Sequence, residues 1–345
     1  MAGITEREIW QQPEAWEWVL DHAPARIEAL KDSVQAGEFV FCGCGSAYHV
    51  GLACAAAFRA CGIQARAETS SEAYLYSDPS RPWRGRTIVA MSRSGETSET
   101  VMALKQAVAQ GAKGIAVTCD PKSTLARAAP ASLVLEPLNE QSVITTKSVT
   151  GMIVAALLAA NILAGSPSPN AALVSRLPER GRDVLKRAEE VCQRAWDAKT
   201  IRQCAFLGSG PLWGVANEAR LKMQEMALVM SEAFPTLEFR HGPMAQCGPQ
   251  MLVVAMLSGA AFELEVDVLR HLAGLGARIL AICEQATPEL NQVTEFIVEQ
   301  KSGLPCHVRQ VLYVPAAHLL ALRAAASRGL DPDSPPHLVR SVILG

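Results

Sequence analysis

The sequence lacks several features that mark whole classes of protein. Among its 345 residues, 32 lysines and arginines nearly balance 34 acidic residues, and no basic block is present for a nucleic-acid backbone or an anionic membrane. Met1 to Trp10 carries Glu6, Arg7 and Glu8 where a secretory signal would be apolar. We therefore expect a cytoplasmic protein whose partner is a small molecule, with neither nucleic acid nor membrane involved.

Long apolar runs and metal-binding patterns are also missing. The most apolar stretch, Val149 to Ala164, is shorter than the ~20 residues of a membrane-spanning helix, so we predict a buried helix there. Cys42 and Cys44 have no matching Cys or His pair elsewhere in the sequence that would complete a zinc site. Most of the ten cysteines lie in apolar runs, as buried reduced thiols do. We expect no disulfide, no metal and no organic cofactor.

Short β-branched runs alternate with alanine-rich segments along the chain. This alternation is typical of βα units that form a parallel sheet covered by helices on both faces. The expected strands of the first half are Phe39 to Cys42, Thr87 to Met91, Ile115 to Thr118 and Leu133 to Leu135.

The two halves of the chain resemble each other. Residues 41–50 align with residues 206–215 at an offset of 165 positions, and both segments have the pattern strand, glycine turn, helix. The same offset places residues 89–91 on 254–256 and residues 115–117 on 280–282 without a gap. One register across three segments indicates an internal duplication.

The duplication predicts two α/β domains, each a doubly wound, flavodoxin-like parallel sheet flanked by helices. We place them at residues 1–170 and 171–345, separated at Ser166 to Asn170, whose prolines and small polar residues interrupt the helical pattern. A helical lead is expected to open the first domain, and a helical segment, Leu173 to Ala198, the second. The tail after the second domain is expected to close the site.

A cluster of hydroxyl side chains follows the expected strand Thr87 to Met91. The segment Ser92 to Thr97 precedes an alanine-rich helical run, Ser98 to Gln110, so its hydroxyls and backbone amides would lie at a helix N-terminus. Such a position favours a phosphate group. The alternative is that Ser94 and Thr97 only cap the helix.

The second half has lost most of these hydroxyls. The offset places Leu257, Ser258 and Gly259 opposite the residues at 92, 93 and 94. We therefore expect a single phosphate site per chain. Gly43 to Tyr48 also resembles a dinucleotide fingerprint, but tyrosine stands where the third glycine should be, so NAD binding is only a weak alternative.

Three charged residues recur at helical spacing in the segment Val215 to Met230. Glu218, Lys222 and Glu225 stand at i, i+4 and i+7 and share one face of the expected helix. By itself this pattern most often marks a solvated surface. His241 lies in a loop-like stretch, where an imidazole could exchange protons near neutral pH or could be incidental.

Several motifs, in order along the chain, resemble the sugar isomerase (SIS) domain family. The resemblance is strongest to the isomerase half of glucosamine-6-phosphate synthase, to amino-sugar-6-phosphate deaminases and to tagatose-6-phosphate ketose/aldose isomerases. It covers nearly the whole chain, so it implies two tandem SIS domains. The motifs are Arg7 to Pro13, Gly43 to Ser46, Ser92 to Thr97, Thr145 to Lys147, Glu225, Arg240 to Pro243 and the tail Leu338 to Leu344.

The resemblance implies roles for individual residues. Glu225 would move a proton between C1 and C2 of the sugar through an enediol or enolamine, and Lys222 would assist charge balance. His241 would open the sugar ring and reach into the neighbouring subunit's site, which implies a homodimer. The phosphate would be held by Ser46, Ser92, Ser94 and Thr97, with Arg93 adding a charged contact, and the rest of the substrate by Val143, Thr145, Lys147, Glu218 and Arg340.

Two departures from the synthase pattern limit the expected reaction. Arg340 stands in the tail where the synthase has a lysine that forms a Schiff base, and a guanidinium is a poor nucleophile for this step. Lys147 is a candidate replacement. No glutaminase domain precedes this segment in the sequence, so glutamine-dependent synthesis by this chain alone is not expected.

The sequence thus predicts a phosphosugar isomerase or isomerising deaminase that acts on a hexose or hexosamine 6-phosphate. One alternative is a synthase-like aminating or deglycating enzyme without the glutaminase domain. Another is a non-catalytic sugar-phosphate sensor, although no DNA-binding extension is visible. The helix-face spacing of Glu218, Lys222 and Glu225 allows a catalytic role, and the resemblance favours it over the solvated one.

Overall fold

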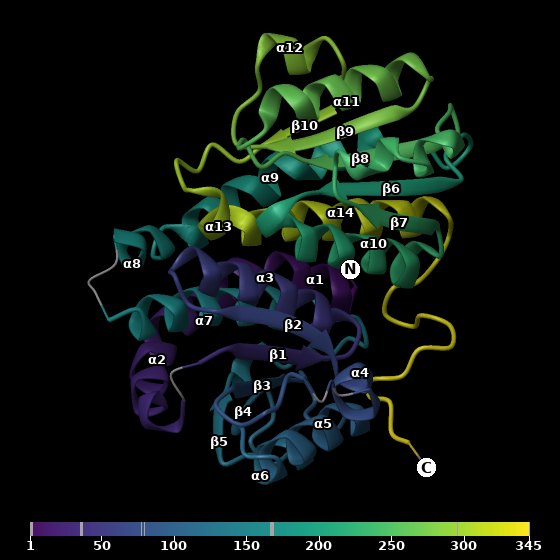
Figure 1. Cartoon of the computed structure of the whole chain (residues 1–345). Helices are drawn as coiled ribbons and strands as arrows, with labels where there is room; N and C mark the ends of the chain where they lie inside the picture. The colour runs from purple at the N-terminus through teal and green to yellow at the C-terminus, as the bar shows by residue number, and fades with distance from the viewer. Residues whose placement is uncertain are drawn as a thin grey trace. The chain divides into compact units, whose positions relative to one another are not determined.

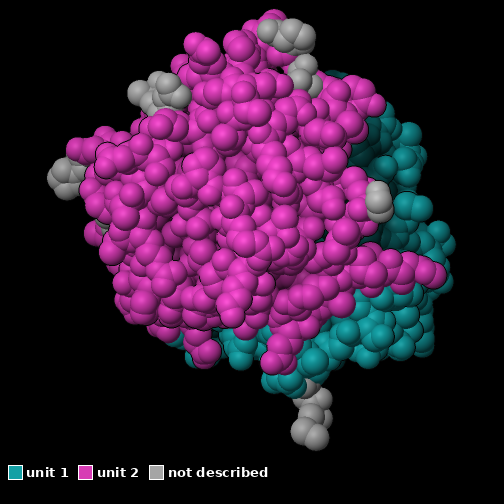
Figure 2. Space-filling model, turned by 90° about the horizontal axis from the view of Figure 1, so that it is seen from below, with its two compact units in different colours: residues 1–13, 177–336 teal, residues 14–176, 337–345 magenta. Residues whose placement is uncertain are grey.

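A computed structural model describes residues 3–34, 37–76, 78, 80–165, 169–294 and 296–344. The chain forms two compact units, which Figure 2 shows in different colours. Unit 2 consists of residues 14–176 and 337–345 and holds the first repeat, whereas unit 1 consists of residues 1–13 and 177–336 and holds the second. The passage from one unit to the other lies close to the boundary expected at residue 170, although residues 166–168 of the expected linker lie outside the described residues.

The two ends of the chain differ from the ranges that the sequence predicts. The N-terminal helix α1 (Ile4–Trp10) belongs to unit 1, because the Asp333 carboxylate accepts hydrogen bonds from the N–H groups of Ile4 at 2.6 Å and Thr5 at 2.7 Å. The C-terminal residues 337–345 belong to unit 2. Each end is thus attached to the repeat that is more distant in sequence.

The sheet of unit 2 has five parallel strands in the order β2-β1-β3-β4-β5 (Figure 1). All four strands predicted for this half are present within a few residues. Strand β2 was not predicted, because its residues are mostly half-buried and polar and therefore lack an apolar run. The strands are β1 (Phe39–Gly43), β2 (Ala65–Thr69), β3 (Thr87–Met91), β4 (Lys113–Thr118) and β5 (Ala131–Val134).

Helices cover both faces of this sheet (Figure 1). Side chains of β1, β3 and β4 pack with α4, α5 and α6 in one apolar core, and the opposite face packs against α3, α7 and the end of α2. The predicted buried helix is confirmed as α7. The helical elements are α2 (Gln12–Ala29), η1 (Lys31–Ser33), α3 (Ser46–Ala60), α4 (Ser70–Leu75), α5 (Ser98–Ala109), α6 (Thr124–Ala128), η2 (Glu136–Leu138), α7 (Lys147–Leu163) and α8 (Pro169–Val174).

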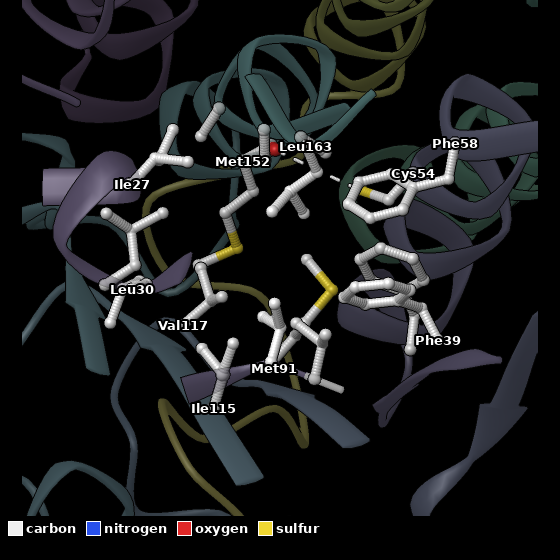
Figure 3. Close-up of a pocket in the computed structure, with 17 residues that line it drawn as sticks. Ile27, Leu30, Phe39, Cys54, Phe58, Met91, Ile115, Val117, Met152 and Leu163 are labelled. Atoms are coloured by element: carbon white, nitrogen blue, oxygen red, sulfur yellow. Dashed lines mark hydrogen bonds between the residues drawn. The ribbon is translucent and has the colours of Figure 1, made fainter. Parts of the chain in front are cut away.

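An apolar cavity of about 60 Å³ lies in the second of these cores (Figure 3). Small side chains on α7, such as Ala155 and Ala156, face larger ones of the sheet, such as Met91 and Phe39, and leave this volume unfilled. The Cys54 thiol on its wall donates to the Met152 carbonyl at 3.9 Å. A cavity with so little polar lining offers no groups that would bind a sugar phosphate.

Unit 1 repeats the same architecture. Its sheet has the order β10-β9-β8-β6-β7, all strands parallel, with α11 over one face and α9, α10 and α14 on the other (Figure 1). The strands are β6 (Gln203–Gly208), β7 (Met230–Phe234), β8 (Met251–Met256), β9 (Arg278–Cys283) and β10 (Phe296–Glu299). The helical elements are α9 (Leu177–Ala195), η3 (Gly210–Leu212), α10 (Trp213–Ala227), η4 (Glu238–Arg240), η5 (Pro243–Gln246), α11 (Phe262–Gly274), α12 (Pro288–Asn291), α13 (Cys306–Arg309), η6 (Gln310–Leu312) and α14 (Tyr313–Ser327).

The predicted duplication is confirmed and extends further than the sequence showed. Strands β2 and β7, and likewise β5 and β10, also correspond at the offset of 165 residues. Backbone hydrogen bonds repeat at the same offset: Ser92 N–H donates to the Val117 carbonyl at 3.0 Å, and Leu257 N–H donates to the Ile282 carbonyl at 2.9 Å. Both sheets therefore have the flavodoxin-like order 2-1-3-4-5.

No helix in the described part of the chain is both long and apolar enough to cross a membrane.

Candidate functional site

The segment Ser92 to Thr97, here called the hydroxyl turn, connects β3 to the N-terminus of α5. The Ser92 and Thr97 hydroxyl groups lie 3.1 Å apart, and the Ser94 hydroxyl accepts the Glu96 N–H at 3.2 Å. Neither Ser94 nor Thr97 caps α5 by the usual side-chain hydrogen bond to the helix. Several hydroxyls therefore converge at a helix N-terminus, as an anion site requires.

Two further residues of the hydroxyl turn fix its shape. Gly95 has a φ of +67°, and a Cβ atom there would lie 2.2 Å from the Ser123 hydroxyl, so only glycine fits. The Glu96 carboxylate accepts the Thr124 N–H at 2.8 Å and the Thr124 hydroxyl at 2.7 Å, which ties the turn to α6. Glu96 is thus engaged in structure and leaves the hydroxyls to face a ligand.

The glycine loop after β1 lies at the same edge of the sheet. Gly45 has a φ of +54°, and Ser46 is the first residue of α3. Because β1 and β3 are neighbours whose following helices lie on opposite faces, this edge is the topological switch point where doubly wound sheets bind ligands. The structure thus places Ser46 and the hydroxyl turn at adjacent strand ends of one sheet.

Arg93 points into the protein, toward the segment that precedes α7. It is 7% exposed, and its guanidinium donates to the carbonyls of Ser142 at 2.9 Å and Val143 at 3.2 Å. The buried Glu140 carboxylate lies 3.7 Å away and accepts the N–H groups of Thr146 and Ser148 at the start of α7. The expected phosphate contact from Arg93 remains a prediction, and these bonds to the protein's own groups disfavour it.

Glu140 was not predicted from the sequence, although it orders a segment that carries three predicted substrate residues. Val143 receives a bond from Arg93, and Thr145 and Lys147 are half-buried at the start of α7. A single glutamate in an irregular segment gives no periodic signal, so no pattern in the sequence could have identified it. Its effect is to join the hydroxyl turn to this segment through the Arg93 guanidinium.

The C-terminal tail lies against the N-terminus of α5. The Val342 carbonyl accepts the Ser98 N–H at 3.3 Å, and the Arg340 carbonyl accepts a bond from Arg93 at 3.2 Å. The exposed Arg340 side chain donates to the Asn139 amide oxygen at 2.6 Å and to the Gln141 carbonyl at 3.3 Å. The tail is therefore fixed beside the hydroxyl turn, and Arg340 binds protein groups in the place where the synthase resemblance has lysine.

In unit 1, α10 carries the predicted row of charges. Glu218 and Lys222 are buried, with 2% and 0% exposure, so the solvated interpretation of this row is wrong. The Lys222 ammonium lies 3.2 Å from Glu218 and 2.6 Å from Glu225. The Glu225 side chain is 20% exposed, which leaves one carboxylate of the row accessible.

The charge on Lys222 is held by its two neighbours. Burial alone lowers the pKa of Lys222, but the carboxylates of Glu218 and Glu225 more than compensate, so the net pKa is raised. Behind the row lies His318 on α14, fully buried, with its pKa lowered to about 3 by burial. A cationic lysine beside a neutral histidine is the resulting state at neutral pH, and the sequence pattern gave no sign of His318.

His241 lies in the turn between η4 and η5 of unit 1. Its side chain is exposed, and its backbone N–H donates to the Glu238 carbonyl at 2.9 Å. The contribution of this imidazole to a partner's site stays a prediction.

Among the residues that the structure describes, no group of three or more His, Cys, Asp or Glu side chains is placed to hold a metal ion.

Comparison with known proteins identifies the class. The family model of the SIS domain matches residues 34–162 and 199–304, one segment in each repeat, and the chain therefore belongs to the SIS domain family. The hydroxyl turn lies in the first matched segment, and the charged row of α10 in the second.

Individual relatives carry names of sugar-phosphate enzymes. The chain is 29% identical over 337 residues to glutamine–fructose-6-phosphate aminotransferase (isomerizing) of Leifsonia xyli, covering 93% of this chain and 54% of that protein. The chain thus spans about half the length of the curated relatives it matches. Among solved structures, glucosamine-6-phosphate deaminase of Thermotoga maritima is 28% identical, with a TM-score of 0.80 over 99% of this chain and 100% of that one. Tagatose-6-phosphate ketose/aldose isomerase of Escherichia coli has a TM-score of 0.85 over 98% and 96% of the two chains at 20% identity, a likeness of fold.

Proposed function

We propose that this chain is a phosphosugar isomerase or isomerising deaminase that acts on a hexose or hexosamine 6-phosphate. The row of Glu218, Lys222 and Glu225 carries the proposal, because a fully buried ammonium between two carboxylates is costly unless the arrangement has a use. The hydroxyl turn at the N-terminus of α5 supplies the second requirement, a group of donors for the phosphate of the substrate. The fold family and the names of the relatives support the same class of substrate.

In the proposed binding mode, the hydroxyl turn holds the 6-phosphate. The hydroxyls of Ser92, Ser94 and Thr97 donate to phosphate oxygens, and Ser46 contributes from the neighbouring strand end. The N-terminus of α5 adds its partial positive charge. Because Arg93 is engaged by carbonyl groups, neutral donors rather than a guanidinium carry most of this recognition.

In the proposed reaction, Glu225 moves one proton. Its carboxylate removes the proton from C2 of the open-chain aldose while the carbonyl oxygen at C1 gains a proton, which gives an enediol or, from an amino sugar, an enolamine. Glu225 then returns its proton to C1, and the oxygen or nitrogen at C2 gives up one proton as a ketose or imine forms. With an amino sugar, water hydrolyses the imine at C2 and ammonia leaves. Lys222 stabilises the carboxylate that takes part, and Glu218 holds Lys222.

The proposal also includes a homodimer in the cytoplasm. In this dimer, His241 of one subunit opens the sugar ring in the site of the other. The exposed position of His241 in a turn is compatible with contact to a second copy. A sensor that binds the sugar phosphate without turnover would not need a buried Lys222 between two carboxylates, and this observation ranks sensing below catalysis.

A second candidate is an aminating or deglycating enzyme of the synthase type. The observation that favours it is the 29% identity to aminotransferases over 93% of the chain. Arg340 argues against a Schiff base from the tail, because its guanidinium is bound to Asn139 and Gln141 and stays protonated. Lys147 at the start of α7 is the residue to test if an imine forms.

A coupled assay tests these candidates. The purified chain is given glucosamine, galactosamine, fructose and tagatose 6-phosphates in turn, and both free ammonia and the isomeric sugar are measured. Ammonia with a ketose identifies the deaminase, and an isomer without ammonia identifies the isomerase. Saturable binding of a sugar phosphate without either product would overturn the enzymatic proposal in favour of a sensor.

A further inference from the structure

The second repeat has a turn at the place of the hydroxyl turn, with a single hydroxyl side chain, that of Ser258. Residues 257–262, here called the second turn, connect β8 to α11, a helix of 13 residues. The second turn contains Gly259 with a φ of +83°, one position before the place that corresponds to Gly95, whose φ is +67°. Its first N–H makes the same bond to the neighbouring strand, at the same offset, as that of Ser92. The second turn is therefore a cradle at the same place in the fold, between the third strand of the sheet and a helix N-terminus.

A carboxylate from α11 occupies this cradle. Glu265 is 1% exposed, and one of its oxygens accepts the Ser258 hydroxyl at 3.3 Å, while Ser258 itself accepts the Ala260 N–H at 3.1 Å. Burial raises the pKa of Glu265, and hydrogen bonds from Ser258 and Gly259 oppose that rise. The counterpart of Glu265 at the offset of 165 is Thr100, which is also buried but uncharged.

The surroundings of Glu265 are positively polarised. Arg309 is 6% exposed and donates to the Ser258 carbonyl at 2.6 Å, and its charge also opposes the rise in the pKa of Glu265. The N-terminus of α11 adds its partial positive charge. The second carboxylate oxygen of Glu265 is buried without a hydrogen-bond partner among the described residues. The net pKa of Glu265 stays raised, so Arg309 and the hydrogen bonds of the turn offset only part of the cost of burying the carboxylate.

We propose that Glu265 is a built-in anion of the second repeat: its carboxylate fills the cradle that in the first repeat is open to phosphate. The second turn still favours an anion, and the carboxylate of Glu265 takes the place of a bound phosphate. This explains physically why a duplicated chain presents one phosphate site and not two. The ligand class, a phosphate dianion, rests on the proposed function of the hydroxyl turn.

The test uses the full chain with Glu265→Ala, Glu265→Gln and, as a matched control, Glu263→Ala from the exposed face of the same helical turn. Thermal unfolding is followed in chloride and in inorganic phosphate at equal ionic strength, and phosphate binding is measured by calorimetry. We expect Glu265→Ala to unfold at a lower temperature than the wild type in chloride. Phosphate should raise its unfolding temperature more than that of the wild type, and the variant should bind one additional phosphate per chain. Glu263→Ala should behave as the wild type in all three respects.

Glu265→Gln separates charge from size. The amide of this variant still fills the cradle. We therefore expect its unfolding temperature to be lower than that of the wild type, and phosphate to raise that temperature by no more than it raises that of the wild type. An unchanged number of phosphate sites in Glu265→Ala, or a Glu265→Gln variant as stable as the wild type, would overturn the inference. If Glu265→Ala does not fold in either buffer, the Gln variant decides.

The rise in the unfolding temperature of the wild type in phosphate reports on the hydroxyl turn alone. Its absence would count against the proposed function, whereas the difference between Glu265→Ala and the wild type would still test the second turn.

Discussion

The two repeats share one backbone plan but differ in where their chemistry lies. In the first repeat, hydroxyls follow the third strand, and the helix after the first strand carries alanines at the positions that correspond to Glu218, Lys222 and Glu225. In the second repeat this helix carries the three charged residues, and the turn after the third strand keeps one hydroxyl, that of Ser258. The difference teaches that a doubly wound sheet offers two positions at its switch point where side chains can gather, and the proposed function assigns a different one to each copy.

The largest expected effect comes from the charged row. Glu225→Gln removes the proposed base while keeping its size, and we expect turnover to fall by about 10²- to 10⁴-fold, the usual contribution of a positioned acid or base. The coupled assay measures this, with the exposed Glu263→Gln as control. A variant with turnover within twofold of the wild type would contradict a catalytic role for α10.

The left-handed glycine of each turn, Gly95 in the first and Gly259 in the second, tests the turns directly. Gly95→Ala would place a Cβ 2.2 Å from the Ser123 hydroxyl and distort the hydroxyl turn, whereas at Gly259 the nearest atom, of the Arg309 guanidinium, is 3.5 Å away. We expect about 100-fold lower kcat/KM for Gly95→Ala, comparable to loss of a preorganised donor. Gly259→Ala should cost only the ~1 kcal/mol of a left-handed alanine in the free energy of unfolding.

If both glycine variants lowered kcat/KM equally, the proposed division of roles between the two turns would be wrong. Sugar-phosphate binding measured beside turnover would show whether Gly95→Ala acts on affinity.

Lys222→Met tests whether the row is a stability element as well. Removing the buried ammonium leaves Glu218 and Glu225 without their shared partner, and we expect a loss of about 3–5 kcal/mol in the free energy of unfolding. Urea denaturation measures it, with the exposed Lys199→Met as control. Equal stability of the two variants would mean that the charges are not coupled.

The last expected effect is confined to acid pH and concerns the pH dependence of stability. Because burial lowers the pKa of His318 to about 3, the unfolded chain binds a proton below its ordinary pKa of 6.5 while the folded chain does not. As the pH falls from 6.5 to about 3, this group should therefore lower the free energy of unfolding by up to about 1.4 kcal/mol per pH unit. Above pH 6.5 it should have no effect on stability. Denaturation of His318→Gln should lack this contribution, whereas the exposed His337→Gln should keep it. Identical pH profiles for the two variants would refute the assignment.

Much of the fold could be predicted because it depends on short-range patterns. Apolar β-branched runs gave β1, β3, β4 and β5, and the repeated offset gave the duplication. β2 could not be found this way, because a strand whose side chains are half-buried and polar has no apolar run. The unit to which each chain end belongs could not be predicted for another reason. The hydrogen bonds of Asp333 with α1 and of Ser98 with the tail join residues hundreds of positions apart.

The candidate site was predictable in part. The hydroxyl turn follows from a local motif at a helix start. The burial of Glu218 and Lys222 does not, because periodicity assigns residues to a face of α10 without saying what covers that face. Packing of α14 against α10, which brings His318 to the row, is a long-range event with no signature in either helix alone.

The sequence by itself determined the α/β class, the duplication and the position of the hydroxyl turn, because hydrophobic period, glycine placement and helix starts are properties of neighbouring residues. Only the tertiary structure decided that Lys222 is a buried charge, that Arg93 binds carbonyl groups, and that Glu265 fills the second turn. These outcomes depend on which groups meet across the fold and on how much water they lose, and the cost of desolvating a charge depends on those distant neighbours.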